Sequence, residues 1–157
     1  MIGLAENRYG KSRIRLVRVK RHRERHDFCE WTLEILLQGD FESCFTDGDN
    51  SKILATDTMK NTVYSLARDS SAACMEEFGK ELVNFLLRRN PQVSRAEVTI
   101  SEKAWEHLVA AGKPHPTAFV QSGGDDVGTS AEDEGRAPLT EASVSSHDHQ
   151  VWRRVAA

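Results

Sequence analysis

Three residues in the first third of the chain have types and positions suited to moving a proton beside a bound anion. Thr56 and Asp57 lie in the run Ala-Thr-Asp-Thr, directly before an amphipathic, helix-like pattern. Lys11 follows Tyr-Gly at the start of an alternating, strand-like pattern. A lysine that is partly removed from water can accept a proton through a neighbouring hydroxyl or water, and the first amides of a helix bind anions. The three residues therefore form a candidate site for acid–base chemistry.

The same three residues also have a purely structural interpretation. Thr56 or Asp57 can be the N-cap of the helix, because both residue types accept hydrogen bonds from first-turn amides. Lys11 is then an ordinary surface charge. On spacing alone the structural interpretation is the preferred one.

Other clusters of metal-ligand residue types do not predict a metal site. His22 and His26 lie at the end of a strand-like pattern, where four residues span about 13 Å. The Asp-Gly-Asp-Asn run at residues 47–50 has neither a glycine nor a closing glutamate at the spacing that a calcium loop requires. His147 and His149 lie in a polar segment with no periodic pattern. We therefore expect no bound metal.

Composition and charge restrict the class of protein. The chain has 157 residues, enough for one domain of ordinary size, and a formal net charge of −3. Residues 8–25 hold nine Lys or Arg, but aromatic residues do not alternate with them, so we expect a solvated sheet face rather than a nucleic-acid site. No apolar run approaches the roughly 20 residues of a membrane span. The three widely spaced cysteines, Cys29, Cys44 and Cys74, predict reduced thiols in a cytoplasmic protein.

Hydrophobic periodicity predicts an α+β fold. Apolar and polar residues alternate in four segments, and two helical patterns stand between the second and the third. This order predicts an antiparallel four-stranded sheet with two helices on one face. A change of parity at Leu16–Val17 predicts a β-bulge in the first strand. The strands are expected at residues 10–23, 26–40, 94–105 and 115–123.

The remaining boundaries follow from loop and capping residues. Residues 41–52 are rich in Asp, Gly, Asn and Ser and predict a loop. The first helix is expected from Asp57, and the second to be capped by Ser70 or Ser71 and to stop before Pro91. From residue 123 the composition shifts to small and acidic residues, which predicts a domain over 1–123 and a disordered tail over 124–157.

Four stretches of the sequence resemble the N-terminal half of urate oxidase (uricase). The most distinctive contains the Ala-Thr-Asp-Thr run, and another contains Tyr-Gly-Lys. Together the resemblance covers residues 8 to about 123, and it implies the family's T-fold, in which strands and helices follow the order ββααββ. The matching stretches are residues 8–19, 39–68, 79–87 and 112–123.

The resemblance implies a reaction and a role for each candidate residue. Lys11 and Thr56 match the family's proton relay, Thr56 also contacts the substrate, and Asp57 helps to hold the purine at the helix start. The implied substrates are urate and molecular oxygen, and the implied products are 5-hydroxyisourate and hydrogen peroxide. No metal or other cofactor is implied. The family forms homotetramers with active sites between subunits.

The resemblance also implies that part of the site lies elsewhere. The family's second T-fold domain supplies a histidine, an arginine, a glutamine and a phenylalanine, and none can be placed in this sequence. We therefore expect a partial chain that carries half of each intersubunit site. Two alternatives stay open: a catalytically silent purine- or pterin-binding T-fold module, and a non-functional fragment with uncovered sheet edges.

Overall fold

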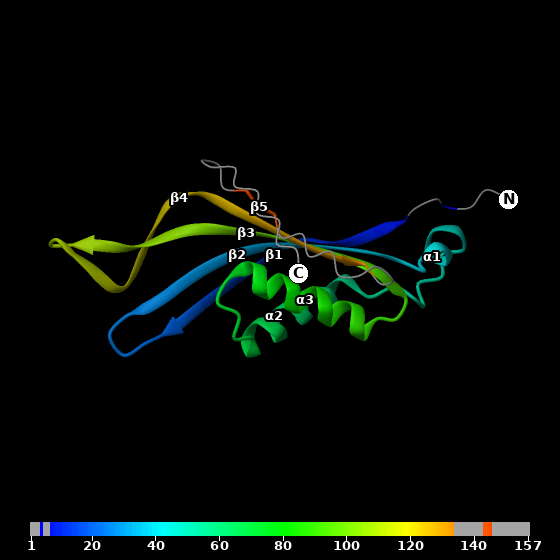
Figure 1. The fold of residues 1–157 in the computed structure, drawn as a ribbon, viewed down its shortest axis with the longest axis horizontal. Helices are drawn as coiled ribbons and strands as arrows, with labels where there is room; N and C mark the ends of the chain where they lie inside the picture. Colours follow the sequence, from blue (N-terminus) through cyan, green and yellow to red (C-terminus); the bar gives the residue numbers. More distant parts are fainter. Residues whose placement is uncertain (1–3, 5–6, 134–142, 146–157) are drawn as a thin grey trace.

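The computed structural model of the chain describes residues 4, 7–133 and 143–145, and only the backbone of 124–133 and 143–145. It is an antiparallel sheet in the order β1-β2-β3-β4-β5, with α2 and α3 packed on one face (Figure 1). The predicted α+β class and the order ββααββ are confirmed for the first four strands. The elements are β1 Arg8–Arg21, β2 His26–Gly39, α1 Glu42–Thr46, α2 Thr56–Asp69, α3 Met75–Arg89, β3 Val93–Ala110, β4 Lys113–Asp133 and β5 Ser143–Ser145.

The core lies between the sheet and the two long helices. Alternate residues of β2 point at the helices, and Ile35 and Leu37 are fully buried there. Helix α3 meets them with apolar residues spaced three and four apart, including Phe78 and Leu82. A helix with such a stripe folds mainly by burying it against a partner surface. None of the described helices is long and apolar enough to cross a membrane.

Two predictions for the segments between β2 and β3 differ from the structure. The expected loop over 41–52 contains the one-turn helix α1. Helix α3 begins after Cys74 rather than after Ser70 or Ser71, and Ser70 instead ends α2. Serine is a preferred N-cap, but here the Ser70 amide donates to the Leu66 carbonyl at 2.8 Å and closes the last turn of α2.

The largest difference concerns the segment expected to be disordered. Strand β4 runs to Asp133, so the expected domain boundary at 123 lies inside a strand, and residues 125–133 pair with β3. The composition of this segment is poor in strand formers. However, β3 is 18 residues long and offers a row of backbone groups that pair without regard to side-chain type. The rest of the expected tail, 134–142 and 146–157, lies outside the described residues.

A β-bulge interrupts the pairing of β1 with β2. Lys11 pairs with Ile35 and Ile14 pairs with Leu33, so that Ser12 and Arg13 together oppose one residue of β2. Arg13 adopts a positive φ of 57°, as residues in bulges often do. The predicted bulge at Leu16–Val17 is therefore wrong in position. The misleading signal came from Val17, which is apolar but 52% exposed on the face of the sheet that the helices leave uncovered.

We expect Gly10→Ala to disrupt the β1–β2 pairing. A Cβ atom built on Gly10 would overlap the backbone carbonyl oxygen of Ile35, and backbone cannot swing aside as a flexible side chain can. The free energy of unfolding should fall by more than about 3 kcal/mol, measured by urea denaturation. Gly123→Ala is the control, since its Cβ would meet only the Ala104 side chain at 3.8 Å. Equal stabilities of the two variants would contradict the close approach at Gly10.

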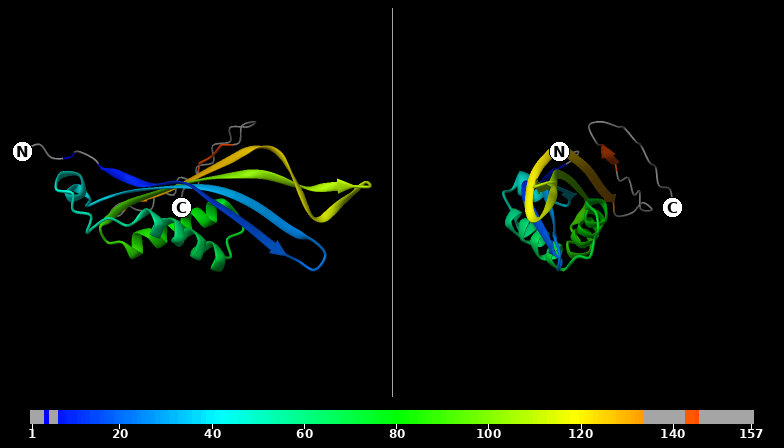
Figure 2. Two further views of the ribbon diagram at one scale, coloured as in Figure 1. Left: turned by 180° about the vertical axis from the view of Figure 1, so that it is seen from behind. Right: turned by 90° about the vertical axis from the view of Figure 1, so that its left-hand side faces the viewer.

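Two hairpins extend beyond the helices, as the left view of Figure 2 shows. Aromatic contacts join the β1–β2 hairpin to the β3–β4 hairpin. The ring of Phe28 lies 5.2 Å from that of Trp105 and 5.3 Å from that of Phe119, centroid to centroid, and His107 lies 4.6 Å from Phe119. Each such aromatic pair adds stability beyond its buried area, so the two hairpins support each other without a helix beneath them.

The uncovered face of the sheet carries a buried carboxylate. Glu30 is 4% exposed and forms an ion pair with Arg15 of the neighbouring strand. The hydrogen bond from Arg15 holds the pKa of Glu30 below its ordinary value of 4.5. A carboxyl with a lowered pKa stabilises the fold fully above its ordinary pKa, and this contribution is lost as the pH falls through the folded-state value.

We therefore expect acid sensitivity that depends on Glu30. The melting temperature of the chain should fall between about pH 5 and pH 3, and Glu30→Gln should flatten that fall while lowering stability at neutral pH. Glu34→Gln, which removes an exposed carboxylate from the same strand, is the matched control. Thermal unfolding followed by circular dichroism across this pH range gives both slopes. An equal flattening in the two variants would exclude the ion pair as the cause.

Candidate functional site

Strand β1 holds helix α2 at its start, its middle and its end. At the start, the Tyr9 hydroxyl accepts a hydrogen bond from the Leu54 amide at 2.7 Å and donates one to the Leu54 carbonyl at 3.3 Å. In the middle, the Tyr64 hydroxyl donates to the Arg15 carbonyl at 3.2 Å. At the end, Arg18 donates to the Ser70 carbonyl at 3.1 Å. The helix is thereby fixed along the strand that carries Lys11.

Lys11 lies on the face of the sheet that the helices cover. Its partner across the strands is Ile35, which is fully buried under the helices, and residues directly opposite each other in an antiparallel pair share a face. Tyr9, two residues earlier, lies on the same face opposite Leu37. Lys11 is half-buried rather than fully exposed. The interpretation of Lys11 as an ordinary surface charge is therefore not supported.

The start of α2 is not capped by a side chain. The N-cap residue is Ala55, with φ −56° and ψ 137°, and it makes no side-chain cap hydrogen bond. The first helical hydrogen bond runs from the Met59 amide to the Ala55 carbonyl at 3.1 Å. Thr56 and Asp57 are the first two residues of the helix, so the interpretation of either one as the N-cap is wrong. Their amides belong to the first turn, which has no partner within the helix.

Both residues present their side chains to solvent. Within the part of the chain that the structure describes, neither the Thr56 hydroxyl nor the Lys11 ammonium has a hydrogen-bond partner, and the two side chains do not bond to each other. Asp57 forms an ion pair with Lys60 at 3.1 Å, in which the Asp57 side chain is 78% exposed. An exposed pair of this kind adds little stability. The structure thus brings the Tyr-Gly-Lys and Ala-Thr-Asp segments together through Tyr9 and Leu54, with their polar groups available.

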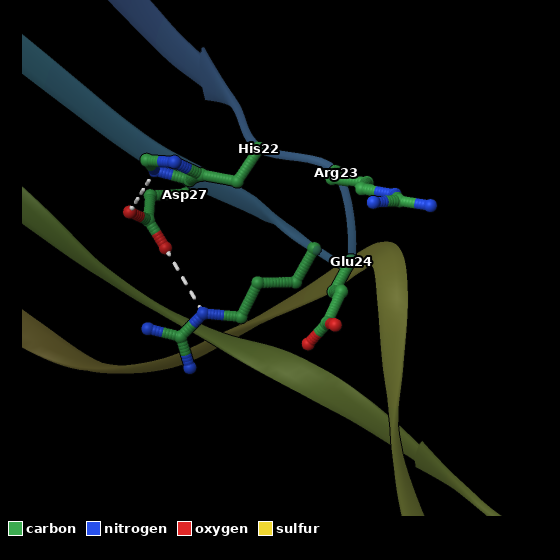
Figure 3. Close-up of a pocket in the computed structure, with 5 residues that line it drawn as sticks. His22, Arg23, Glu24 and Asp27 are labelled. Atoms are coloured by element: carbon green, nitrogen blue, oxygen red, sulfur yellow. Dashed lines mark hydrogen bonds and ion pairs between the residues drawn. The ribbon is translucent and has the colours of Figure 1, made fainter.

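The histidine pair at the other end of β1 has a different geometry from the one expected. His22 follows β1 and His26 opens β2, so they flank a hairpin turn rather than lying along one strand. His22 Nε2 lies 2.9 Å from Asp27 Oδ2, and Arg25 Nε lies 3.5 Å from Asp27 Oδ1, around an open depression (Figure 3). Among the described residues, no group of three or more His, Cys, Asp or Glu is placed to hold a metal ion.

Sequence reasoning missed the part played by Tyr9. Its ring meets Phe41 edge to face, with centroids 4.7 Å apart, and its hydroxyl bridges to a residue 45 positions away in the chain. The one signal in the sequence was its parity, because Tyr9 and Lys11 are separated by two and so share a face before the bulge. A hydrogen bond to backbone over that separation leaves no mark on composition or periodicity.

Comparison with known proteins identifies the family. The family model described as Uricase matches residues 7–132. Curated relatives include the uricase of Dictyostelium discoideum, 38% identical over 122 residues, and that of Arabidopsis thaliana, 42% identical over 121 residues. These alignments cover 76% and 73% of this chain, but 42% and 38% of the relatives.

Solved structures agree in fold. The crystal structure of uricase from Arthrobacter globiformis matches with a TM-score of 0.78 and 30% identity, over 92% of this chain and 47% of that one. A uricase from Bacillus fastidious matches with a TM-score of 0.73 at 21% identity. The chain spans about half the length of the uricases it matches, and it has their T-fold. On the family model, the relatives and the fold together, this chain belongs to the uricase family.

Proposed function

We propose that the chain supplies one half of a urate oxidase active site. The reaction is the cofactor-independent oxidation of urate by molecular oxygen, with water, to 5-hydroxyisourate and hydrogen peroxide. The observation that carries the proposal is the Tyr9–Leu54 contact in a uricase-family chain. It joins the strand that carries Lys11 to the uncapped helix start that carries Thr56 and Asp57.

Each of the three residues takes a role that its position allows. Lys11, half-buried on the helix-covered face, accepts and returns a proton through the hydroxyl of Thr56. Thr56 also contacts the urate ring. Asp57 offers its first-turn amide to the purine, since the start of a helix favours an anion. Removal of a proton from urate makes the ring electron-rich enough to give two electrons to oxygen, which leaves as hydrogen peroxide.

The proposal requires groups beyond these three. By the resemblance to the family, a histidine, an arginine, a glutamine and a phenylalanine from a second T-fold domain complete the site. In a homo-oligomer, a tetramer in the family, the partner subunit presents that domain to Lys11 and Thr56. The proposed domain of this chain begins near residue 7 and includes β4 to Asp133, as the family match does.

A cytoplasmic location is part of the proposal. Cys29, Cys44 and Cys74 are free thiols in the structure. Burial raises the pKa of the Cys29 thiol, which makes it less reactive. Unpaired cysteines of this kind suit a reducing compartment.

The test joins this chain to the remaining half of the Arthrobacter globiformis uricase and follows the loss of urate absorbance with hydrogen peroxide formation. Turnover with one peroxide released per urate is the expected result. A joined protein that is folded and tetrameric, that binds urate, and that shows no turnover would instead support a silent purine-binding module. A joined protein that is folded and does not bind urate would overturn both the proposed oxidase function and the silent purine-binding module.

A further inference from the structure

We propose that Tyr9 is a positioning residue that fixes the start of helix α2 relative to Lys11. The proposal rests on the function proposed above, and adds a residue that holds the relay in place without exchanging a proton with urate. Tyr9 lies in β1 on the same face as Lys11, and it acts through the backbone of Leu54, two residues before Thr56.

The Tyr9 hydroxyl makes both of its hydrogen bonds to one residue. It accepts from the Leu54 amide at 2.7 Å and donates to the Leu54 carbonyl at 3.3 Å. Two bonds to the two ends of one residue restrain both the position and the orientation of the backbone there. Leu54 itself packs against the core, so the chain entering α2 is held by its side chain and its backbone together.

Packing contacts hold the ring of Tyr9 in place. It meets the fully buried Phe41 edge to face, with an angle of 88° between the rings, and it lies opposite the fully buried Leu37. Burial also raises the pKa of the Tyr9 hydroxyl. The group therefore keeps its proton at neutral pH, as it must to donate and accept at once.

The start of α2 depends on this contact because the N-cap residue has no side chain that could fix the helix start by a hydrogen bond. The N-cap is Ala55, which makes no side-chain cap hydrogen bond. The preceding segment includes an exposed loop over residues 47–52. Without the Tyr9 hydroxyl, the chain directly before Thr56 would be held by the packing of Ile53 and Leu54 and by the hydrogen bond from the Ile53 amide to the Asn50 carbonyl.

Tyr64 provides a matched control. Its hydroxyl also joins α2 to β1, through a hydrogen bond to the Arg15 carbonyl at 3.2 Å. That bond lies in the middle of the helix, away from Thr56. Tyr9→Phe and Tyr64→Phe thus remove the same atom and the same kind of contact, and differ in whether the helix start loses its support.

The first experiment uses the 157-residue chain and amide hydrogen exchange. Tyr9→Phe should raise the exchange rate of the Leu54 amide by about tenfold, since that amide loses its acceptor. Tyr64→Phe should leave that rate within about twofold. An unchanged Leu54 rate in Tyr9→Phe would overturn the proposal. If Tyr9→Phe does not fold, the unaltered chain decides: a Leu54 amide that exchanges as fast as the exposed Thr56 amide overturns the proposal, and a protected one supports it.

The second experiment measures urate turnover in the protein joined to the remaining half of a uricase. Tyr9→Phe should lower kcat per folded molecule by about tenfold or more, because small misplacements of reacting groups cost that much. Its pH profile should keep its shape, and Tyr64→Phe should stay within about twofold of the unaltered protein. A lost limb of the pH profile would make Tyr9 a proton carrier and overturn the positioning role.

Lys11→Ala separates the two proposals. If Lys11→Ala lowers kcat and Tyr9→Phe does not, positioning by Tyr9 is overturned and the proposed function stands. If Lys11→Ala leaves kcat unchanged, the proposed relay is overturned, and the role of Tyr9 in positioning that relay is overturned with it.

Discussion

Replacement of Lys11 or Thr56 by alanine should lower urate turnover by about 10²- to 10⁴-fold once the chain is joined to the remaining half of a uricase. Lys11→Ala removes the group that accepts the proton, and Thr56→Ala removes the hydroxyl that carries it. Since the two act in one relay, the double variant should be scarcely slower than the slower single variant. Steady-state rates from urate absorbance, divided by the folded fraction, give the comparison.

Controls distinguish a relay from a loss of fold or of substrate binding. Thr56→Ser keeps the hydroxyl and should retain most of the turnover. Because Ala55 is the N-cap, Thr56→Ala should change the free energy of unfolding by less than the 0.5 to about 2 kcal/mol expected for a lost cap. Asp57→Ala keeps the first-turn amide that holds the purine, so it should change KM and turnover by no more than about twofold. Unchanged turnover in both Lys11→Ala and Thr56→Ala would exclude the relay.

The second large effect is expected from the 157-residue polypeptide alone. It should oxidise urate at least about 10⁴-fold more slowly than the joined protein, because single groups that stabilise the transition state each contribute about 10² to 10³. Several such groups come from the second domain by the resemblance to the family. The assay is the same loss of urate absorbance, at matched concentrations of folded protein.

Two measurements make that comparison interpretable. Circular dichroism and cooperative thermal unfolding establish that the polypeptide is folded. Mixing it with the separately produced remaining half of the Arthrobacter globiformis chain should restore turnover if the halves associate. Full activity of the polypeptide alone would show that the site does not need the second domain, contrary to the proposal.

The parts of the fold that follow a simple period were predictable from the sequence. Strand β2 alternates cleanly, and Trp31, Leu33, Ile35 and Leu37 are buried on one face as the alternation indicates. The stripe of α3, with acidic residues in its first turn and basic residues in its last, predicted a helix that ends before Pro91. In both elements burial on one face dictates the residue types, so the spacing of the apolar residues predicts the structure.

Features that depend on backbone pairing were not predictable in the same way. Residues 125–133 form a strand because β3 offers them a partner, although their composition favours disorder. The bulge was expected at Leu16–Val17 and lies at Ser12–Arg13. The prediction failed because Val17 is apolar although it is exposed, so the alternation of apolar residues suggested a change of face where there is none. At the candidate site, the sequence placed Thr56 and Asp57 at a helix start, but it could not show that Ala55 is the cap or that Tyr9 holds Leu54.

The bulge at Ser12–Arg13 has a consequence for how the gene can change. Deleting one of the two residues would leave a single residue opposite Glu34, so β1 would become a regular strand with Lys11 still opposite Ile35. Deleting both would place Lys11 next to Ile14, and every residue before the deletion would then turn to the opposite face. In the two-residue deletion Tyr9 and Lys11 would leave the helices together, while Ile14 and Leu16 kept their places in the core. A two-codon deletion here should therefore give a protein that still folds and has lost its chemistry, whereas a one-codon deletion should keep both. A screen for solubility or abundance would not distinguish the two deletions.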